Sequence, residues 1–148
     1  MSNVGITGPG QGHLLSARGN VLAFKAVAAQ TGGDFSLMER TVPAGARMPP
    51  AHRHVNCSEA FFVLEGEITF LLDGATATGG PGDFLLVPRG AGHTFGNVSG
   101  EAARLLVLHA PAMDAYFEEL HRLWAEPASP PSAQAERELM SRYGMEPA

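Results

Sequence analysis

The chain has 148 residues, of which 45% are hydrophobic, and this size and composition suit one folded domain with a single core. Its formal net charge is -5 and only 10 residues are Lys or Arg, which argues against nucleic acid or an anionic membrane surface as a partner. The sequence has no basic and apolar leader and no apolar run near the roughly 20 residues of a membrane span, so we expect a soluble, cytoplasmic protein.

A series of short apolar runs, separated by glycine- and proline-rich turns, fills the sequence up to Pro111. Runs broken every 8 to 12 residues or so are typical of antiparallel sandwiches and barrels. They predict strands within 20–27, 34–42, 59–66, 67–74, 83–90, 93–100 and 103–110. This part of the chain is therefore predicted to be all-β.

Two turns in this region have a recognisable composition. Glu65-Gly66 lies between two apolar runs and predicts a tight hairpin that pairs them, because glycine readily adopts the positive φ that such turns demand. Asp73-Gly74 marks the next turn.

Between the turns, Cys57 is the only cysteine of the sequence, so no disulfide can form within the chain. A thiol at this position could bind a metal, react or simply pack. We take packing as the default, because free cysteine usually behaves as a small hydrophobic side chain.

The pattern changes after Pro111. Apolar residues between 113 and 124 recur at spacings of three and four, which predicts an amphipathic helix that ends before Pro127. Ser132 can cap a second, weaker helix that runs to Gly144.

These changes divide the chain into a β-barrel domain over 1–111 and a helical extension over 112–148 that packs on the barrel. The apolar stripe of the first helix has to be covered, either as a permanent brace on the barrel or as a lid over bound substrate. We favour the brace, because exposing so many large apolar side chains at each opening would be costly.

Two histidines one residue apart precede the run 59–66. Residues two apart on a strand face the same side, so His52 and His54 would present both imidazoles to one ion, with Arg53 facing the other way. Glu59 can face them if the chain bends within 55–58. An isolated pair of this kind can also be merely solvated. His93, on a distant strand, would supply the third imidazole that closes a site inside a barrel.

Together these segments resemble the two motifs of the cupin superfamily. The first motif is matched by Gly45, His52, His54, Glu59 and Gly66, with one extra residue between Gly45 and His52. The second motif is matched by Gly82, Pro88, Gly90, His93 and Asn97. The resemblance covers about residues 20 to 110 and implies a double-stranded β-helix, the jelly-roll barrel of cupins, followed here by the C-terminal α-helices.

The resemblance also implies a ligand set of His52, His54, Glu59 and His93. We expect one divalent transition metal per chain, with iron as the first choice and nickel, manganese, cobalt, copper or zinc as alternatives. Four protein ligands leave one or two positions open for substrate, water or dioxygen. His109 and His121 are interpreted as packed or surface side chains outside this set, and His13 lies in a turn-rich leader.

Glu59 has a second expected role, as a catalytic base. Burial among apolar side chains would raise the proton affinity of its carboxylate. Strand alternation lets Phe95 and Phe61 line the cavity as substrate-binding residues, with Phe95 the best candidate because it is in register with His93. Met48 is a third candidate.

The chain most resembles small cupins of the quercetin dioxygenase-like group, which implies a metal-dependent dioxygenase or other oxygenase acting on a small aromatic or enolic compound. Two alternatives stay open. The metal could serve only as a Lewis acid in an isomerase, cyclase or decarboxylase, or the barrel could bind a small ligand without catalysis. A homodimer is expected, because exposed edge strands are commonly covered by pairing.

Overall fold

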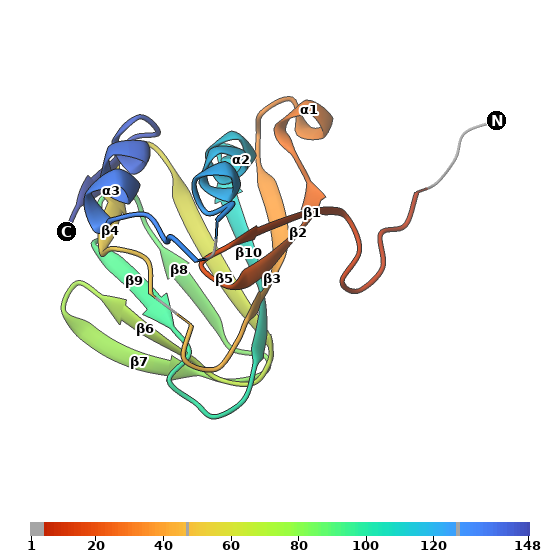
Figure 1. Cartoon of the computed structure of the whole chain (residues 1–148). Coiled ribbons are helices and arrows are strands. Elements are labelled where there is room, and N and C mark those ends of the chain that lie inside the picture. Colours follow the sequence, from red (N-terminus) through yellow and green to blue (C-terminus); the bar gives the residue numbers. More distant parts are fainter. Residues whose placement is uncertain (1–4, 47, 127) are drawn as a thin grey trace.

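The structure is a computed structural model that describes residues 5–46, 48–126 and 128–148 (Figure 1). Two antiparallel sheets pack face to face, and the helices lie at one end of this sandwich. The architecture is the predicted all-β sandwich with C-terminal helices. Within the described ranges, no helix is long and apolar enough to cross a membrane.

The larger sheet has six strands in the order β1-β2-β3-β10-β5-β8. Its strands are β1 His13–Ala17, β2 Asn20–Ala26, β3 Ser36–Val42, β10 Ala103–Ala110, β5 Ser58–Glu65 and β8 Phe84–Val87. The smaller sheet has five strands in the order β11-β4-β9-β6-β7. Its strands are β11 Met145–Pro147, β4 His52–His54, β9 His93–Gly96, β6 Ile68–Leu72 and β7 Ala75–Gly79.

Alternation along β10 and β5 builds the centre of the core. Every second residue of β10 is buried, beginning at Ala103 and ending at His109. The antiparallel register sets these residues beside the inward residues of β5, in the pairs Leu105–Val63, Val107–Phe61 and His109–Glu59. The inner row is therefore apolar along most of its length and ends in two ionisable side chains at one end of the barrel.

The predicted hairpin at Glu65-Gly66 is wrong. Strand β5 pairs with β10 and β8, whereas β6 pairs with β7 and β9 in the other sheet. Gly66 has φ 74°, and a Cβ there would lie 2.8 Å from the carbonyl oxygen of Ala102. The turn therefore carries the chain from one sheet to the other, past the start of β10, and only glycine fits both the conformation and the close approach.

The second predicted turn is confirmed. Asp73 and Gly74 have φ values of 46° and 82° and connect β6 to β7, with Leu72 opposite Ala75. Positive φ at both central residues is typical of the two-residue type I′ hairpin, whose twist matches that of its strands.

Three strands and one helix were not predicted. Strands β1 and β7 are short or made of small residues, and the short helix α1, Ala28–Thr31, interrupts the chain between β2 and β3. His13, assigned to a leader, begins β1. Strand β11 follows the last helix and pairs with β4, with Met145 opposite His54.

Both predicted helices are present as α2, Asp114–Leu123, and α3, Ala133–Ser141. Tyr116, Phe117 and Leu120 form the buried face of α2. The Oγ atom of Ser132 accepts a hydrogen bond from the Ala135 N–H at 3.1 Å, which confirms the predicted N-cap. Pro127, the predicted stop signal, lies outside the described residues.

A buried ion pair attaches α3 to the barrel. The Nε atom of Arg18 lies 2.9 Å from Glu136 Oε1, and both side chains are at most 2% exposed. Trp124 donates to the same oxygen at 2.6 Å. Because a buried charge without its partner is strongly destabilising, this pair favours the brace interpretation of the C-terminal segment.

We predict that truncation after Pro111 lowers the melting temperature sharply or makes the protein insoluble. It uncovers the apolar surface under α2, removes β11 from β4 and leaves Arg18 without Glu136. The lost ion pair alone is expected to cost about 3–5 kcal/mol, or about 10 °C in a domain of this size. Calorimetry should also show a lower melting temperature for Glu136→Gln but not for Glu138→Gln, whose side chain is exposed. A truncated protein that is stable but binds small molecules poorly would favour the lid instead.

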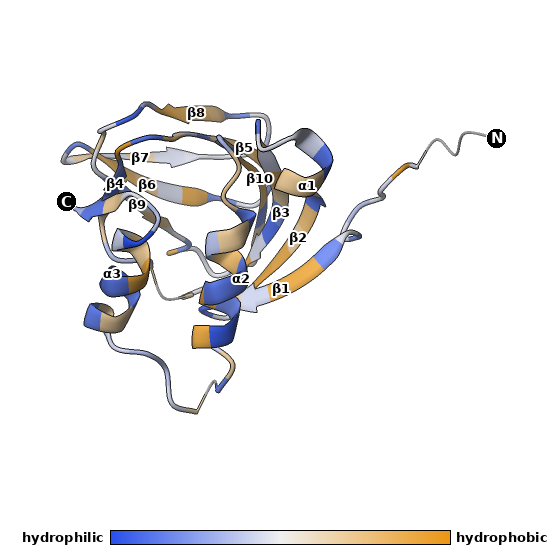
Figure 2. Cartoon of the chain, turned by 90° about the horizontal axis from the view of Figure 1, so that it is seen from above, coloured by the Kyte–Doolittle hydropathy of each residue, from blue (hydrophilic) through white to orange (hydrophobic). Residues whose placement is uncertain are grey.

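We also predict that the homodimer forms through an apolar surface on β8 and β5. Phe62, Phe84 and Leu86 are 41%, 63% and 53% exposed, and the register sets Phe62 beside Phe84. Figure 2 shows the hydrophobic colour of β8 at the rim of the molecule. Light scattering at micromolar concentration should give a dimer for the wild type and a monomer for Leu86→Lys. Leu71→Lys, on the other sheet, is the control, and a monomeric wild type would contradict the prediction.

Candidate metal centre

Three histidines converge because two short strands pair in the smaller sheet. His52 and His54 project from β4 to the same side, and both are buried. Strand β9 places His93 directly opposite His52, with ring centroids 4.5 Å apart. One ring nitrogen from each lies within 4.8 Å of the other two, close enough for a shared ion. The predicted facing of these three residues is confirmed.

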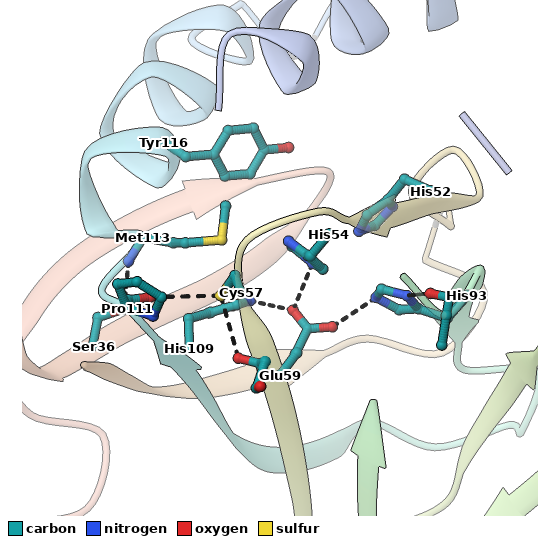
Figure 3. Close-up of polar contacts among 12 residues, drawn as sticks. Ser36, His52, His54, Cys57, Glu59, His93, His109, Pro111, Met113 and Tyr116 are labelled. Atoms are coloured by element: carbon teal, nitrogen blue, oxygen red, sulfur yellow. Dashed lines mark hydrogen bonds and ion pairs between the residues drawn. The ribbon is translucent and has the colours of Figure 1, made fainter. Parts of the chain in front are cut away.

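Glu59 enters the same space from the other sheet, as Figure 3 shows. The chain bends at Val55 and Asn56, within the predicted segment, before β5 begins. The Oε1 atom of Glu59 then lies 2.8 Å from His93 Nε2, and Oε2 lies 3.5 Å from His54 Nε2. The four residues predicted from the motifs therefore lie in one buried cluster between the sheets, in which Glu59 contacts His54 and His93.

His109 also belongs to this cluster, and the sequence analysis missed it. It is 1% exposed, and its Nε2 atom contacts Glu59 Oε2 from the neighbouring strand. His54, Glu59 and His109 form a second group whose ligand atoms lie within 4.8 Å of one another. A signal was present, because alternation places His109 on the same face as Leu105 and Val107. His121, in contrast, lies on α2 and contacts Ser16, outside the cluster, as expected.

Hydrogen bonds to backbone carbonyls orient two of the rings. The Nδ1 atom of His52 lies 2.8 Å from the Pro50 oxygen, and that of His93 lies 3.1 Å from the Ala91 oxygen. A carbonyl can only accept, so each Nδ1 carries the proton and each Nε2 is directed to the centre. This outer hydrogen bond is the usual support of a metal-binding histidine.

The nitrogens of His54 lack such partners. Among the described residues, neither Nδ1 nor Nε2 of His54 has a hydrogen-bond partner, although both are buried; the 3.5 Å contact with Glu59 falls short of a hydrogen bond. A buried polar atom left unpaired costs about 1–3 kcal/mol. A cation bound between His54, His52 and His93 would satisfy a nitrogen that the protein leaves bare, so these residues fit a metal.

The electrostatics of Glu59 correct one expectation. Burial would raise the pKa of its carboxyl group, but the charge and hydrogen bond of His109, with the contacts to His54 and His93, hold that pKa well below the usual range. The prediction of a raised proton affinity overlooked these histidines. Glu59 is therefore an ionised carboxylate, which suits a metal ligand.

The pKa values of His52 and His93 shift in opposite directions. Burial and the neighbouring His93 lower the pKa of His52 to about 3, so its ring is neutral. Burial also disfavours the His93 cation, but the hydrogen bond to Glu59, the charge of Glu59 and the hydrogen bond to the Ala91 carbonyl together outweigh burial and raise the pKa of His93. That hydrogen bond requires a proton on Nε2, and a metal bound there would take the place of this proton.

A small cavity opens beside the cluster. Its free volume is about 20 Å³, roughly the space of one water molecule. It is lined by Arg18, Arg40, Pro49, His52, His54, Glu59, Phe95, His109, Tyr116, Phe117 and Met145. Helix α2 and strand β11 therefore close the cavity, through Tyr116, Phe117 and Met145.

Only one of the three predicted substrate-binding residues lines this cavity. Phe95 does so, whereas Phe61 lies behind it in the core, with ring centroids 5.1 Å apart. Met48 is 40% exposed and lies against Gly96. Cavity-lining roles for Phe61 and Met48 are therefore not supported by their positions. For Phe61 the reason is that strand parity fixes the face of a residue but not its depth in the barrel, and Met48 lies in the connection between β3 and β4.

Cys57 has a packing role, as its default interpretation stated. Burial first, and the nearby charge of Glu59, raise the pKa of its thiol to about 11, so the group stays protonated. The Sγ atom lies 3.2 Å from the Ser58 oxygen and 3.5 Å from the Pro111 oxygen. It belongs to neither group of possible metal ligands among the described residues.

The sequence of this chain is similar to those of known proteins. Residues 38–109 match the family model described as Cupin domain. Quercetin 2,3-dioxygenase of Bacillus subtilis (strain 168) is 32% identical over 103 residues, which are 68% of this chain and 29% of that protein. The chain thus spans less than a third of the length of this curated relative.

Solved structures share the fold. The cupin domain of Schizosaccharomyces pombe Cnp3 superposes with a TM-score of 0.62 at 25% identity, covering 73% of this chain and 74% of that one. A sugar phosphate isomerase from Silicibacter pomeroyi superposes with a TM-score of 0.55 at 24% identity, over 68% of each chain, and shows likeness of fold alone. The matched residues and the paired sheets agree, and this chain belongs to the cupin superfamily.

Proposed function

We propose that this cupin is a metal-dependent enzyme that holds one divalent transition metal, iron in the first place, through His52, His54, Glu59 and His93. The observation that carries the proposal is that both nitrogens of His54 are buried without a hydrogen-bond partner among the described residues, while His54 offers one ligand atom within 4.8 Å of those of His52 and His93. A bound metal would supply an electrophilic centre with open positions for a substrate oxygen and for dioxygen.

The surrounding residues would support such chemistry in distinct ways. His109 holds the Glu59 carboxylate from the side away from His93, so that Glu59 can bind the metal with one oxygen or accept a proton from the substrate. Phe95 and Phe117 wall the cavity and exclude bulk water, which strengthens the electrostatic interactions inside.

We favour an oxygenase acting on a small enolic or aromatic compound. The support is the 32% identity to a protein named quercetin 2,3-dioxygenase, of which this chain spans 29%. The free volume of about 20 Å³ holds about one water molecule, so any organic substrate would require α2 or β11 to move, and a compact enolic compound would require the smaller movement.

Dioxygen consumption separates this proposal from its alternatives. Purified, iron-loaded protein should take up dioxygen in an oxygen electrode with at least one member of a panel of enolic and phenolic compounds. Turnover without oxygen uptake would favour a non-oxidative isomerase, cyclase or decarboxylase. Binding without turnover of any compound would favour a ligand-binding cupin.

We predict that His52→Ala and His93→Ala each reduce bound metal by about ten-fold or more, because each removes an imidazole from a site built of three. Metal analysis of the purified proteins measures the loss, and circular dichroism confirms that they are folded. His121→Ala, outside the cluster, should keep the wild-type metal content. Full metal in either site variant would overturn the ligand assignment.

We predict that Glu59→Gln lowers turnover by about 100-fold or more and metal content much less, because three histidines remain while the amide cannot accept a proton. Glu65→Gln, at the exposed end of the same strand, is the matched control. Turnover and metal content are measured on the same preparation. Parallel loss of both would mean that Glu59 is a ligand and not a base.

A further inference from the structure

Arg40 is a buried charge in the wall of the metal cavity. It lies on β3, is 3% exposed, and its neighbours across the two adjacent strands are Leu22 and Leu105, which are fully buried. Moving a guanidinium from water into such surroundings costs several kcal/mol unless the charge is compensated. Its position in the core therefore calls for a partner.

The protein supplies little compensation for this charge. The Nε atom of Arg40 donates to Asn20 Oδ1 at 2.7 Å, and the guanidinium lies 4.9 Å from the centre of the Phe95 ring. Both partners are neutral. Among the described residues, no carboxylate oxygen lies within 4.0 Å of Arg40, and its two Nη groups make no hydrogen bond with the protein.

Arg18 and Arg104 show the contrast. Arg18 is paired with Glu136, and Arg104 is paired with Glu39 and Glu65. Burial and the charge of Arg18 lower the pKa of Arg40 to about 9, although the charge of Glu59 opposes this shift, so the group still carries its charge at neutral pH. Arg40 is thus a charged, deeply buried side chain whose terminal donors are free.

The free donors belong to the same cavity as the metal ligands. Arg40, His52, His54 and Glu59 all line it, and Phe95 connects them. The charge of Arg18 is matched by Glu136, and that of Glu59 is shared among histidines. A divalent metal would leave this cavity with an excess of positive charge, which an anion would balance.

We propose that Arg40 binds a carboxylate of the substrate, so that this cupin acts on small carboxylic acids. The proposal rests on the proposed function, since it places the acid beside the metal. The planar fork of a guanidinium matches the two oxygens of a carboxylate, and such charge-assisted pairs are the stronger class of hydrogen bond. Because the free volume is about that of one water molecule, even a short acid would require α2 or β11 to move before its enolic oxygen could face the histidines.

Acetate and acetamide are the probes, because they have nearly the same shape and differ in charge. Binding to the full-length protein is measured by calorimetry in chloride-free buffer, with the metal loaded and after its removal by a chelator. The wild type should prefer acetate over acetamide by at least about ten-fold, the value of one charged hydrogen bond. Equal binding of the two probes would overturn the proposal, and tighter binding of inorganic phosphate would overturn its restriction to carboxylates.

Three variants test the role of Arg40 in acetate binding. Arg40→Gln should lose the preference for acetate, and Arg40→Lys should keep part of it. Asn20→Asp should also weaken acetate binding, because it sets a permanent carboxylate beside Arg40 without removing the side chain, and it keeps the test decisive if Arg40→Gln does not fold. Arg89→Gln, an exposed arginine, is the matched control and should bind acetate as the wild type does. Unchanged acetate binding in Arg40→Gln or in Asn20→Asp would refute the role of Arg40.

Metal analysis of each preparation separates the two proposals. A wild type that holds metal but shows no preference for acetate leaves the metal enzyme standing and removes Arg40 from its substrate site. A wild type that binds acetate through Arg40 but holds no metal supports the role of Arg40 and contradicts the metal enzyme. Arg40 lies outside the ligand set, so Arg40→Gln should keep the metal content of the wild type.

Discussion

The Glu59 carboxylate is the group on which the arrangement of the site depends. It is buried between two sheets and can remain ionised there only because His93, His109 and His54 surround it. The pairing of β5 with β10 supplies His109, and the packing of the two sheets supplies His54 and His93. The position of one carboxylate therefore requires both sheets to be in their correct register.

The C-terminal segment completes this site as well as covering it. Strand β11 lies beside the histidine strand β4, and Met145 contributes to the cavity wall. The Arg18–Glu136 pair holds α3, from which β11 follows. The cavity that faces the histidines is thus bounded by Arg18 from the turn between β1 and β2, by residues of the barrel strands, and by Met145 of β11.

Local patterns were sufficient to predict how the four proposed ligands face one another, whereas their role as a ligand set was implied by the resemblance to cupins. Strand parity placed His52 and His54 on one face, and the polar bend before Glu59 brought the carboxylate back toward them. Parity also gave the correct face for Phe95. The same reasoning could not predict which strands pair, because β5 alternates in the same way whether its neighbour is β6 or β10. For this reason the hairpin at Gly66 was wrong, and the contact of His109 with Glu59, which depends on the pairing of β10 with β5, was missed.

The pKa of Glu59 shows a second limit of reasoning from sequence. Desolvation is a property of burial and could be anticipated, but the opposing contribution comes from histidines distant in the chain, and their number around one carboxylate depends on the complete fold. Arg40 is a similar case. Its inward position on β3 follows from alternation, but the absence of a nearby carboxylate among the described residues is a property of three-dimensional packing.

The pairing of β4 has a consequence for the order in which the protein folds. This strand has no partner close in sequence: β9 lies about forty residues further along the chain, and β11 about ninety. Closing such long loops costs conformational entropy before any contact compensates for it, so distant pairings form late. The hairpin of β6 and β7, joined by two residues, can form early. The histidine strand would therefore become ordered near the end of folding, and a metal ion held by its two histidines would be bound late.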